Sequence, residues 1–200
     1  MPSLKSVSRS TMLEVQRALP QQRAYKNGLK QQIENKFKKA QKDFLNNFEK
    51  HPVTLEIGGG PNSTNISGTL NGVGNLFSYI GFDSGTKPLA ALRVLLAKYE
   101  IRYHHAKRST SINITLPTRE EIFKMTPIPW ATGRSWAKGI ETGISGLGQY
   151  LTSNSPRSRS GSAIQTKGKI RAGRFTNIPY LSSLLKEYYK EIRKVEKTSI

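Results

Sequence analysis

Apolar side chains recur at helical spacing through the first quarter of the chain. They stand three or four residues apart at Tyr25, Leu29, Ile33, Phe37, Ala40, Phe44 and Phe48. Such spacing places them on one face of a helix. Lysines occupy the remaining faces, and His51-Pro52 ends the pattern. The pattern predicts one long helix whose coiled-coil-like seam packs either on its own domain or on a neighbouring copy.

Alternating apolar and polar positions follow this helix. Val53, Leu55 and Ile57 alternate with polar residues and predict a strand, and 76–82 predicts another after a Gly/Asn/Ser-rich stretch. Further on, alternation on both sides of Lys107-Arg108-Ser109 predicts a hairpin that carries Ile101, Tyr103, Ile112, Ile114 and Leu116.

Prolines and capping residues mark the other helices. Pro88 opens a second helix, Thr118 and Glu121 form a capping box, and Pro179 opens a terminal amphipathic helix. The inward positions of the terminal helix are Leu181, Leu184, Leu185, Tyr188 and Ile192. We therefore predict a single α+β domain over 1–200, with an N-terminal helical extension (1–50) and a small, mainly antiparallel sheet.

The charge of the chain is its most unusual compositional feature. Its 200 residues include 32 Lys and Arg against 13 Asp and Glu, a net charge of +19. The excess lies at the two ends: 1–50 holds 11 basic and 4 acidic residues, and 152–200 holds 11 and 3. Such a charge indicates a nucleic acid, an acidic protein surface or a larger assembly as partner.

One segment, 152–178, combines positive charge with a loop composition. It holds six basic residues and no acidic one, and it is rich in Ser, Gly and Pro. We predict an extended basic arm, mobile in the isolated chain and ordered in an assembly. Its candidate contact residues are Arg157, Arg159, Lys169, Arg171 and Arg174. Charge alone leaves acidic protein and DNA phosphates both open, and docking on protein is the preferred alternative.

A second candidate interface lies between residues 127 and 143. Trp130 and Trp136 flank Arg134 after a Pro-Ile-Pro run, and Gly139 and Gly143 would let another backbone approach closely. Aromatic and arginine side chains in this arrangement either stack on bases or anchor a subunit interface. We favour the interface and expect Trp136 to matter more to assembly than to folding.

The sequence offers little for catalysis or metal binding. The chain has no cysteine, the Gly58–Gly60 run lacks the Lys-Ser/Thr of a phosphate loop, and Glu120-Glu121 fits a helix cap. His104 and His105 would point to opposite faces of a strand. We predict a non-enzymatic protein with no cofactor and no metal. Because no window reaches 18 apolar residues, no membrane span is expected either.

Residues 65–93 carry a resemblance to a known family. After the long helix come Asn-Ile-Ser-Gly-Thr-Leu (65–70), Leu-Phe-Ser-Tyr-Ile (76–80) and Gly-Thr-Lys-Pro-Leu (85–89), followed by Leu92-Arg93. This order resembles the small neck and tail-completion proteins of tailed bacteriophages. In those proteins a basic helix precedes a Thr-Gly-x-Leu-like turn, and a Gly-Thr…Pro…Leu stretch leads into a second helix. The resemblance covers residues 20–100.

The resemblance implies a virion structural protein without enzymatic activity. It implies a homo-oligomeric ring at the head–tail junction, assembled in the host cytoplasm, which joins the portal or connector to tail proteins and surrounds the DNA path. A non-specific DNA contact is one alternative for the arm. The alternative function is a basic nucleic-acid-binding protein of the ribosomal type, whose affinity would fall steeply with salt.

Overall fold

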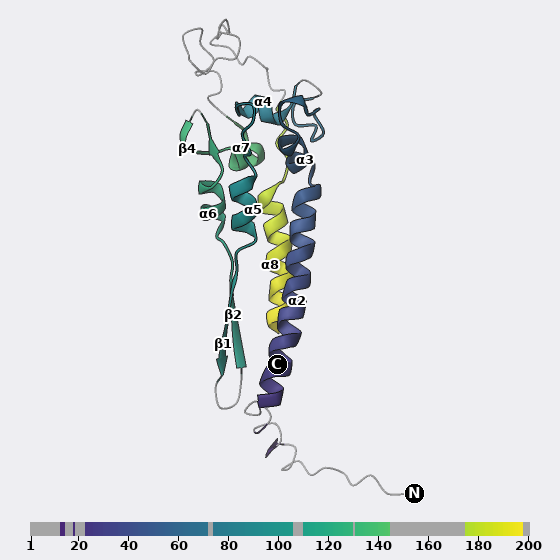
Figure 1. The fold of residues 1–200 in the computed structure, drawn as a ribbon, viewed down its shortest axis with the longest axis vertical. Helices are drawn as coiled ribbons and strands as arrows, with labels where there is room; N and C mark the ends of the chain where they lie inside the picture. Colours follow the sequence, from purple (N-terminus) through teal and green to yellow (C-terminus); the bar gives the residue numbers. More distant parts are fainter. Residues whose placement is uncertain are drawn as a thin grey trace, which may run out of the picture. The chain divides into compact units, whose positions relative to one another are not determined.

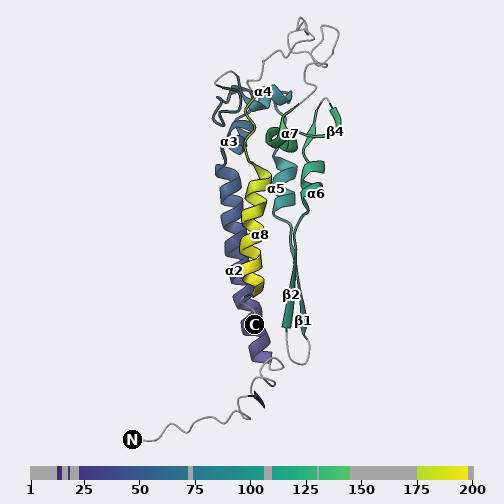
Figure 2. The ribbon, with the colours of Figure 1, turned by 180° about the vertical axis from the view of Figure 1, so that it is seen from behind.

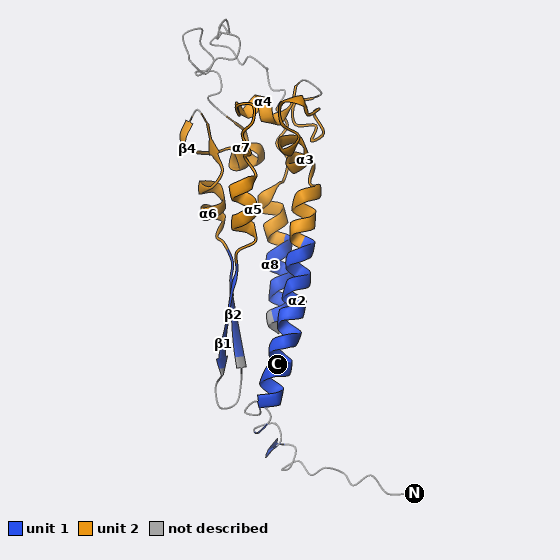
Figure 3. Cartoon of the chain, in the orientation of Figure 1, with its two compact units in different colours: residues 1–43, 99–116, 187–200 blue, residues 44–98, 117–186 orange. Residues whose placement is uncertain are grey.

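The fold is α+β and is built mainly from helices (Figure 1). A computed structural model describes residues 13–14, 18, 23–71, 74–105, 110–129, 131–144 and 175–197. The chain divides into two compact units (Figure 3). Unit 1 takes in 1–43, 99–116 and 187–200, and unit 2 takes in 44–98 and 117–186. Helices α2 (Arg23–Lys50) and α8 (Leu181–Lys197) contribute residues to both units.

Unit 1 joins a β-hairpin to parts of the two long helices. Strands β1 (Glu100–His105) and β2 (Thr110–Thr115) pair antiparallel, with Tyr103 opposite Ile112. Within this unit α8 lies beside α2 in both views (Figures 1 and 2). The core is a cluster of buried residues from the three parts, namely Ile33, Ile112 and Val195, packed against Leu29, Ile101, Tyr103 and Ile114.

The long helix and its apolar seam are confirmed. Helix α2 runs from Arg23 to Lys50, immediately before His51-Pro52. The buried members of the predicted seam are Ile33, Phe37, Phe44 and Phe48. Near the start of the helix the burial weakens: Leu29 is half-buried and Tyr25 is exposed. The seam therefore packs on its own chain from Leu29 onward.

Unit 2 contains the short helices and a second, smaller hairpin. Its helices are α3 (Pro52–Gly58), the 3-10 turn η2 (Gly60–Asn62), α4 (Leu76–Ile80), α5 (Ala90–Leu96), α6 (Arg119–Lys124) and α7 (Trp136–Thr142). The hairpin pairs β3 (Pro127–Ile128) with β4 (Ala131–Ser135). Fully buried side chains of α3, α4, α5 and α6 and of the residue before α8 form its core, among them Ile57, Leu76, Leu92, Ile122 and Tyr180.

The strand predicted at Val53–Ile57 is wrong, because these residues form helix α3. Pro52 occupies the first turn, where its missing N–H costs nothing, and the Val53 amide donates to Nδ1 of His51. Val53 and Ile57, one helical turn apart, are buried, while Leu55 is exposed. The alternation of apolar residues is compatible with both structures, and the N-terminal proline and cap favour the helix.

The strand predicted at 76–82 is also wrong and is replaced by helix α4. The Asn75 side chain accepts a hydrogen bond from the Ser78 amide at 2.8 Å, which caps the helix N-terminus. Gly81 ends the helix with φ 88°, a left-handed conformation that glycine adopts without strain. Both caps are present in the sequence, but the apolar run between them suits a buried strand equally well.

The remaining predicted elements are confirmed. The hairpin forms on either side of 106–109, and helix α6 has the predicted reciprocal cap between Thr118 and Glu121. Helix α5 follows Pro88, and α8 buries Leu181, Leu185 and Tyr188 as expected.

A buried carboxylate organises the Gly/Asn-rich loop of unit 2. Glu56, on α3, is 0% exposed. One of its oxygens accepts from the Ser67 amide at 2.8 Å, and the other accepts from the Leu76 amide at 2.6 Å. A single side chain thus fastens the middle of the loop and the start of α4 to α3.

Replacing Glu56 by glutamine is expected to destabilise the protein by about 1–3 kcal/mol, because an amide –NH2 cannot accept the second backbone N–H. Denaturant unfolding of the full chain measures this loss. The matched control is Glu120→Gln at an exposed position of α6, which should change stability by less than about 0.5 kcal/mol. Equal effects at the two positions would contradict the structural role of Glu56.

Candidate interface site

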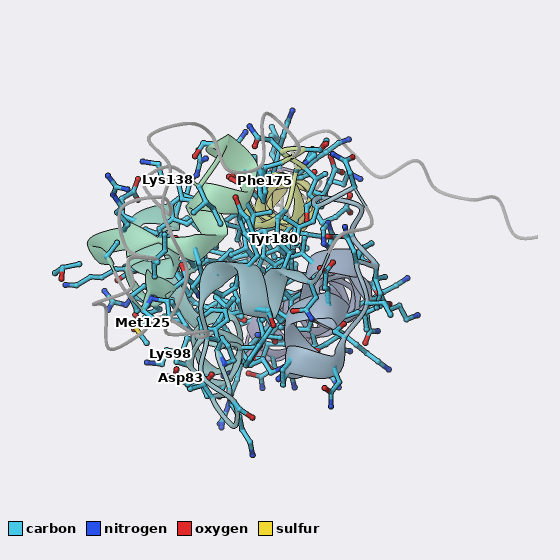
Figure 4. The ribbon with its side chains drawn as sticks, turned by 90° about the horizontal axis from the view of Figure 1, so that it is seen from above. Asp83, Lys98, Met125, Lys138, Phe175 and Tyr180 are labelled. Carbon is cyan, nitrogen blue, oxygen red and sulfur yellow. The ribbon has the colours of Figure 1, made fainter. Side chains whose placement is uncertain are left out.

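Trp136, predicted at a subunit interface, is instead a core residue of unit 2. Its side chain is 1% exposed, and its ring lies 6.1 Å edge-on from Phe82 and 6.3 Å from Tyr180. Viewed from above, Tyr180 lies toward the middle, while Asp83 and Lys138 lie farther out (Figure 4). Within the Pro-Ile-Pro run Ile128 is buried and Pro127 is exposed, and a contact of this run with a neighbour stays a prediction.

The two candidate interface glycines are also explained by their own chain. A Cβ on Gly139 would lie 2.7 Å from the Ile144 side chain, so the close approach is intramolecular. Gly143 ends α7 with φ 99°, a conformation unfavourable for other residues, and Asn177 lies nearby. Both residues act in the local packing of α7, and the contact between subunits predicted for them stays a prediction.

Of the other predicted contact residues, only Arg134 is described. It lies on β4 and its side chain is exposed. Trp130 lies outside the described residues. The same holds for the candidate residues of the basic arm, Arg157, Arg159, Lys169, Arg171 and Arg174.

The C-terminal end of the predicted arm is part of unit 2. The Thr176 amide donates to the carbonyl of Thr69 at 2.8 Å, and the Phe175 ring stacks on Tyr79 with centroids 5.5 Å apart. The Ile178 amide donates to the carbonyl of Ile140 at 3.4 Å. The arm boundary of 178 is thus corrected, because 175–178 already pack on α4, the loop and α7.

A cluster that sequence reasoning missed surrounds Tyr180. The side chain is fully buried, and its hydroxyl is 2.8 Å from the Thr54 hydroxyl. Burial raises the pKa of Tyr180 above its ordinary value. The ring also contacts His51 at 4.8 Å between centroids. Pro179, just before the terminal helix, indicates where that helix begins. No pattern in the sequence indicates that Tyr180 packs against α3.

His51 makes the cluster sensitive to pH. Burial lowers its pKa below 6.5, and a hydrogen bond to the Pro179 backbone opposes this in part. A lowered folded-state pKa means that the unfolded chain binds the proton more readily. The contribution of neutral His51 to stability is therefore present above the unfolded pKa and is lost as the pH falls below it.

The expected result is that wild-type stability falls more steeply between about pH 7 and 5 than that of His51→Asn. Asparagine keeps an N-cap acceptor but does not titrate. Urea unfolding at several pH values measures the difference in slope. Parallel pH profiles for the two proteins would show that His51 does not couple to folding.

Two further acidic groups of unit 2 hold structure, Glu141 through a backbone amide as Glu56 does and Glu49 through an ion pair. Glu141 accepts from the Ser182 amide at 2.6 Å and from its hydroxyl, and lies 3.6 Å from Arg119. This carboxylate anchors the start of α8. Glu49 binds Arg93 through two hydrogen bonds of 2.6 and 2.8 Å, which lowers the Glu49 pKa. Among the described residues, no three His, Asp or Glu side chains are grouped as a metal site.

Unit 1 contains a concave site between α2 and β1. Its cavity volume is about 350 Å³. Three aromatic rings, an isoleucine and three charged side chains form its walls: Phe37, Tyr99, Tyr103, Ile101, Lys30, Glu34 and Lys38. The lining residues of β1 are alternate positions of one face, which the alternation in the sequence had indicated. No local pattern in the sequence indicates that this strand lies against α2.

The outer surface of α2 is strongly basic. The helix carries eight Lys or Arg residues and three acidic residues. In unit 1, Lys38, Lys39 and Lys42 are exposed. Their helical spacing places Lys39 and Lys42 opposite the buried seam of Ile33 and Phe37 and Lys38 beside it, since successive residues are about 100° apart on a helix. The arrangement can bind an anionic surface.

Comparisons of the chain with protein-family models, with curated proteins and with solved structures gave no match. In the part of the chain that the structure describes, no helix has the length and apolar character needed to cross a membrane.

Proposed function

We propose that this chain is a non-enzymatic structural subunit of a tailed-bacteriophage virion, a ring-forming neck or tail-completion protein at the head–tail junction. Its partners are other copies of itself and neighbouring portal, connector or tail subunits. The resemblance over residues 20–100 motivates the assignment. The observation that carries the proposal is where the two kinds of charge lie. Buried carboxylates accept hydrogen bonds from backbone amides of the chain itself, while the lysines of α2 are exposed.

The lysine-rich surface supports an assembly role. Lys38 and Lys42 are four residues apart on α2, and Lys39 and Lys42 are three apart. Like charges at these spacings destabilise a helix by a few tenths of a kcal/mol each. An acidic neighbour offsets that cost, and among the described residues these three lysines form no ion pair. The surface therefore favours a protein whose working state is a complex.

The decisive experiment is native mass measurement and electron microscopy of the purified full chain, with nuclease-treated and DNA-supplemented samples compared. A closed ring of several copies without nucleic acid, or a ring formed with purified neck components, is the expected result. A monomer that forms complexes only with DNA or RNA would refute the proposal.

The lysines of α2 also favour a second candidate, a basic nucleic-acid-binding protein. Exposed Lys38, Lys39 and Lys42 are accompanied on the same helix surface by the amide side chain of Asn35, which is also exposed. Lysine and amide groups bind phosphates without reading sequence. Replacing the three lysines with glutamine should then lower the log–log salt slope of DNA binding by about 0.9 for each phosphate that is no longer neutralised. An unchanged slope would show that α2 does not bind DNA.

A further inference from the structure

The cavity of unit 1 has an aromatic floor with an open edge. Phe37 is fully buried beneath it, and its ring centroid lies 4.6 Å from that of Tyr99. Tyr99 itself is 43% exposed, although it is a large aromatic residue. An exposed ring supported by a buried ring offers a rigid surface for one apolar or aromatic side chain.

The cavity wall contains two lysines and one glutamate, so positive charge is in excess. Lys30 lies 3.9 Å from the Glu34 carboxylate and 5.9 Å from the Tyr103 ring centroid, so these three groups satisfy one another. Lys38 is exposed and forms no ion pair among the described residues. It continues into Lys39 and Lys42 on the outer surface of α2. The rim of the cavity is therefore positive on the Lys38 side.

The strand that forms the other wall has one partner. In the described chain, β1 belongs to a two-stranded sheet in which it pairs with β2 alone. The opposite edge of such a strand presents backbone N–H and C=O groups at the spacing of another strand. Extended peptides add to edges of this kind, and their alternate side chains enter adjacent pockets.

We propose that the cavity and the edge of β1 together form a docking groove for an extended acidic segment of a partner protein. One apolar or aromatic side chain of that segment enters the cavity beside Tyr99. Flanking carboxylates of the segment meet Lys38 and its lysine neighbours. The backbone of the segment continues the sheet along β1.

Two features of the chain favour this occupant. The open edge of β1 offers backbone N–H and C=O groups that an extended polypeptide can pair with and a nucleic acid cannot, so the site suits a polypeptide better than a nucleic acid. A second copy of this chain carries a net charge of +19 and is a poor electrostatic partner for a lysine-rich rim. The inference goes beyond the proposed function, because it holds for any partner chain that carries such a segment.

The test uses the full chain and a fluorescein-labelled acetyl-Glu-Asp-Phe-Glu-Val-Asp-Glu peptide in fluorescence anisotropy. Lys38→Glu and Tyr99→Ala should each weaken binding by about tenfold or more. The matched control is Lys190→Glu, an exposed lysine of α8 in unit 1, which changes the net charge equally and should weaken binding by less than about threefold. A peptide N-methylated at alternate amides should lose binding by a similar factor to Tyr99→Ala, because it cannot extend the sheet. Lys38→Gln removes the positive charge without introducing a negative one. The denaturant midpoint of every variant separates loss of binding from loss of folding.

Several outcomes would overturn the proposal. One is an absence of wild-type binding up to about 1 mM peptide, which corresponds to less than about 4 kcal/mol of affinity. Equal losses in Lys38→Glu and Lys190→Glu would reduce the interaction to net charge. If a ten-residue oligothymidylate binds more tightly, and Tyr99→Ala abolishes that binding but leaves the peptide unaffected, the cavity is a nucleic-acid site. The native-mass experiment on ring formation remains independent of each of these results.

Discussion

Replacing Trp136 by alanine is expected to lower the free energy of unfolding by about 3–5 kcal/mol. The indole is buried between Phe82 and Tyr180, and its removal leaves a cavity that the surrounding rings cannot fill without moving. A small protein has only about 5–15 kcal/mol of stability in total, so the loss is a large fraction of it. Urea denaturation followed by circular dichroism measures the change.

The control for this result is Trp136→Phe, which keeps an aromatic ring in the core and should cost clearly less than the alanine variant. Ser135, whose hydroxyl accepts from the Lys138 amide at 3.0 Å, still caps α7 in both variants. Both differ from wild type in packing alone. A stable Trp136→Ala protein that merely fails to assemble would restore the interface role predicted from the sequence and contradict the burial of this residue within the chain.

The sequence predicts structure most successfully where one pattern extends over many residues. The apolar seam of α2 keeps helical spacing through six successive intervals, and a strand or loop would rarely show such a pattern by chance. The β1–β2 hairpin and the Thr118 capping box also carry local signals with a physical mechanism. These elements depend little on the rest of the chain, which is why local pattern alone identifies them.

Short apolar runs are ambiguous for a physical reason. Val53 to Ile57 and Leu76 to Ile80 each span little more than one helical turn and carry few periods of any repeat. Their structure is decided by end groups and by distant partners, such as the amides of Ser67 and Leu76 that donate to Glu56. The sequence does contain one indication, the acidic Glu56 within an apolar run. A buried carboxylate requires a hydrogen-bond partner, so such a residue indicates a tertiary contact.

The candidate site shows the same limit. Trp136 and Gly139 suit an interface by residue type, but aromatic and small residues are common both in cores and in interfaces. Only the positions of Phe82, Tyr180 and Ile144 decide between the two. Likewise, the cavity of unit 1 brings together α2 and a strand far along the chain, and no local pattern indicates that pairing.

Phe37→Ala is expected to cost about 3–5 kcal/mol and to act on unit 1, because Phe37 is fully buried in the seam and supports the Tyr99 ring. Alanine has the highest helix propensity, so reduced packing rather than a weaker α2 accounts for the effect. Hydrogen exchange should quicken in β1, whose Ile101 and Tyr103 line the same cavity as Phe37, and in β2, which pairs with β1. Phe37→Leu, which retains most of the volume, should cost much less. If Phe37→Ala instead lowers stability by less than about 1 kcal/mol, the seam does not pack on its own chain, and a partner must cover it.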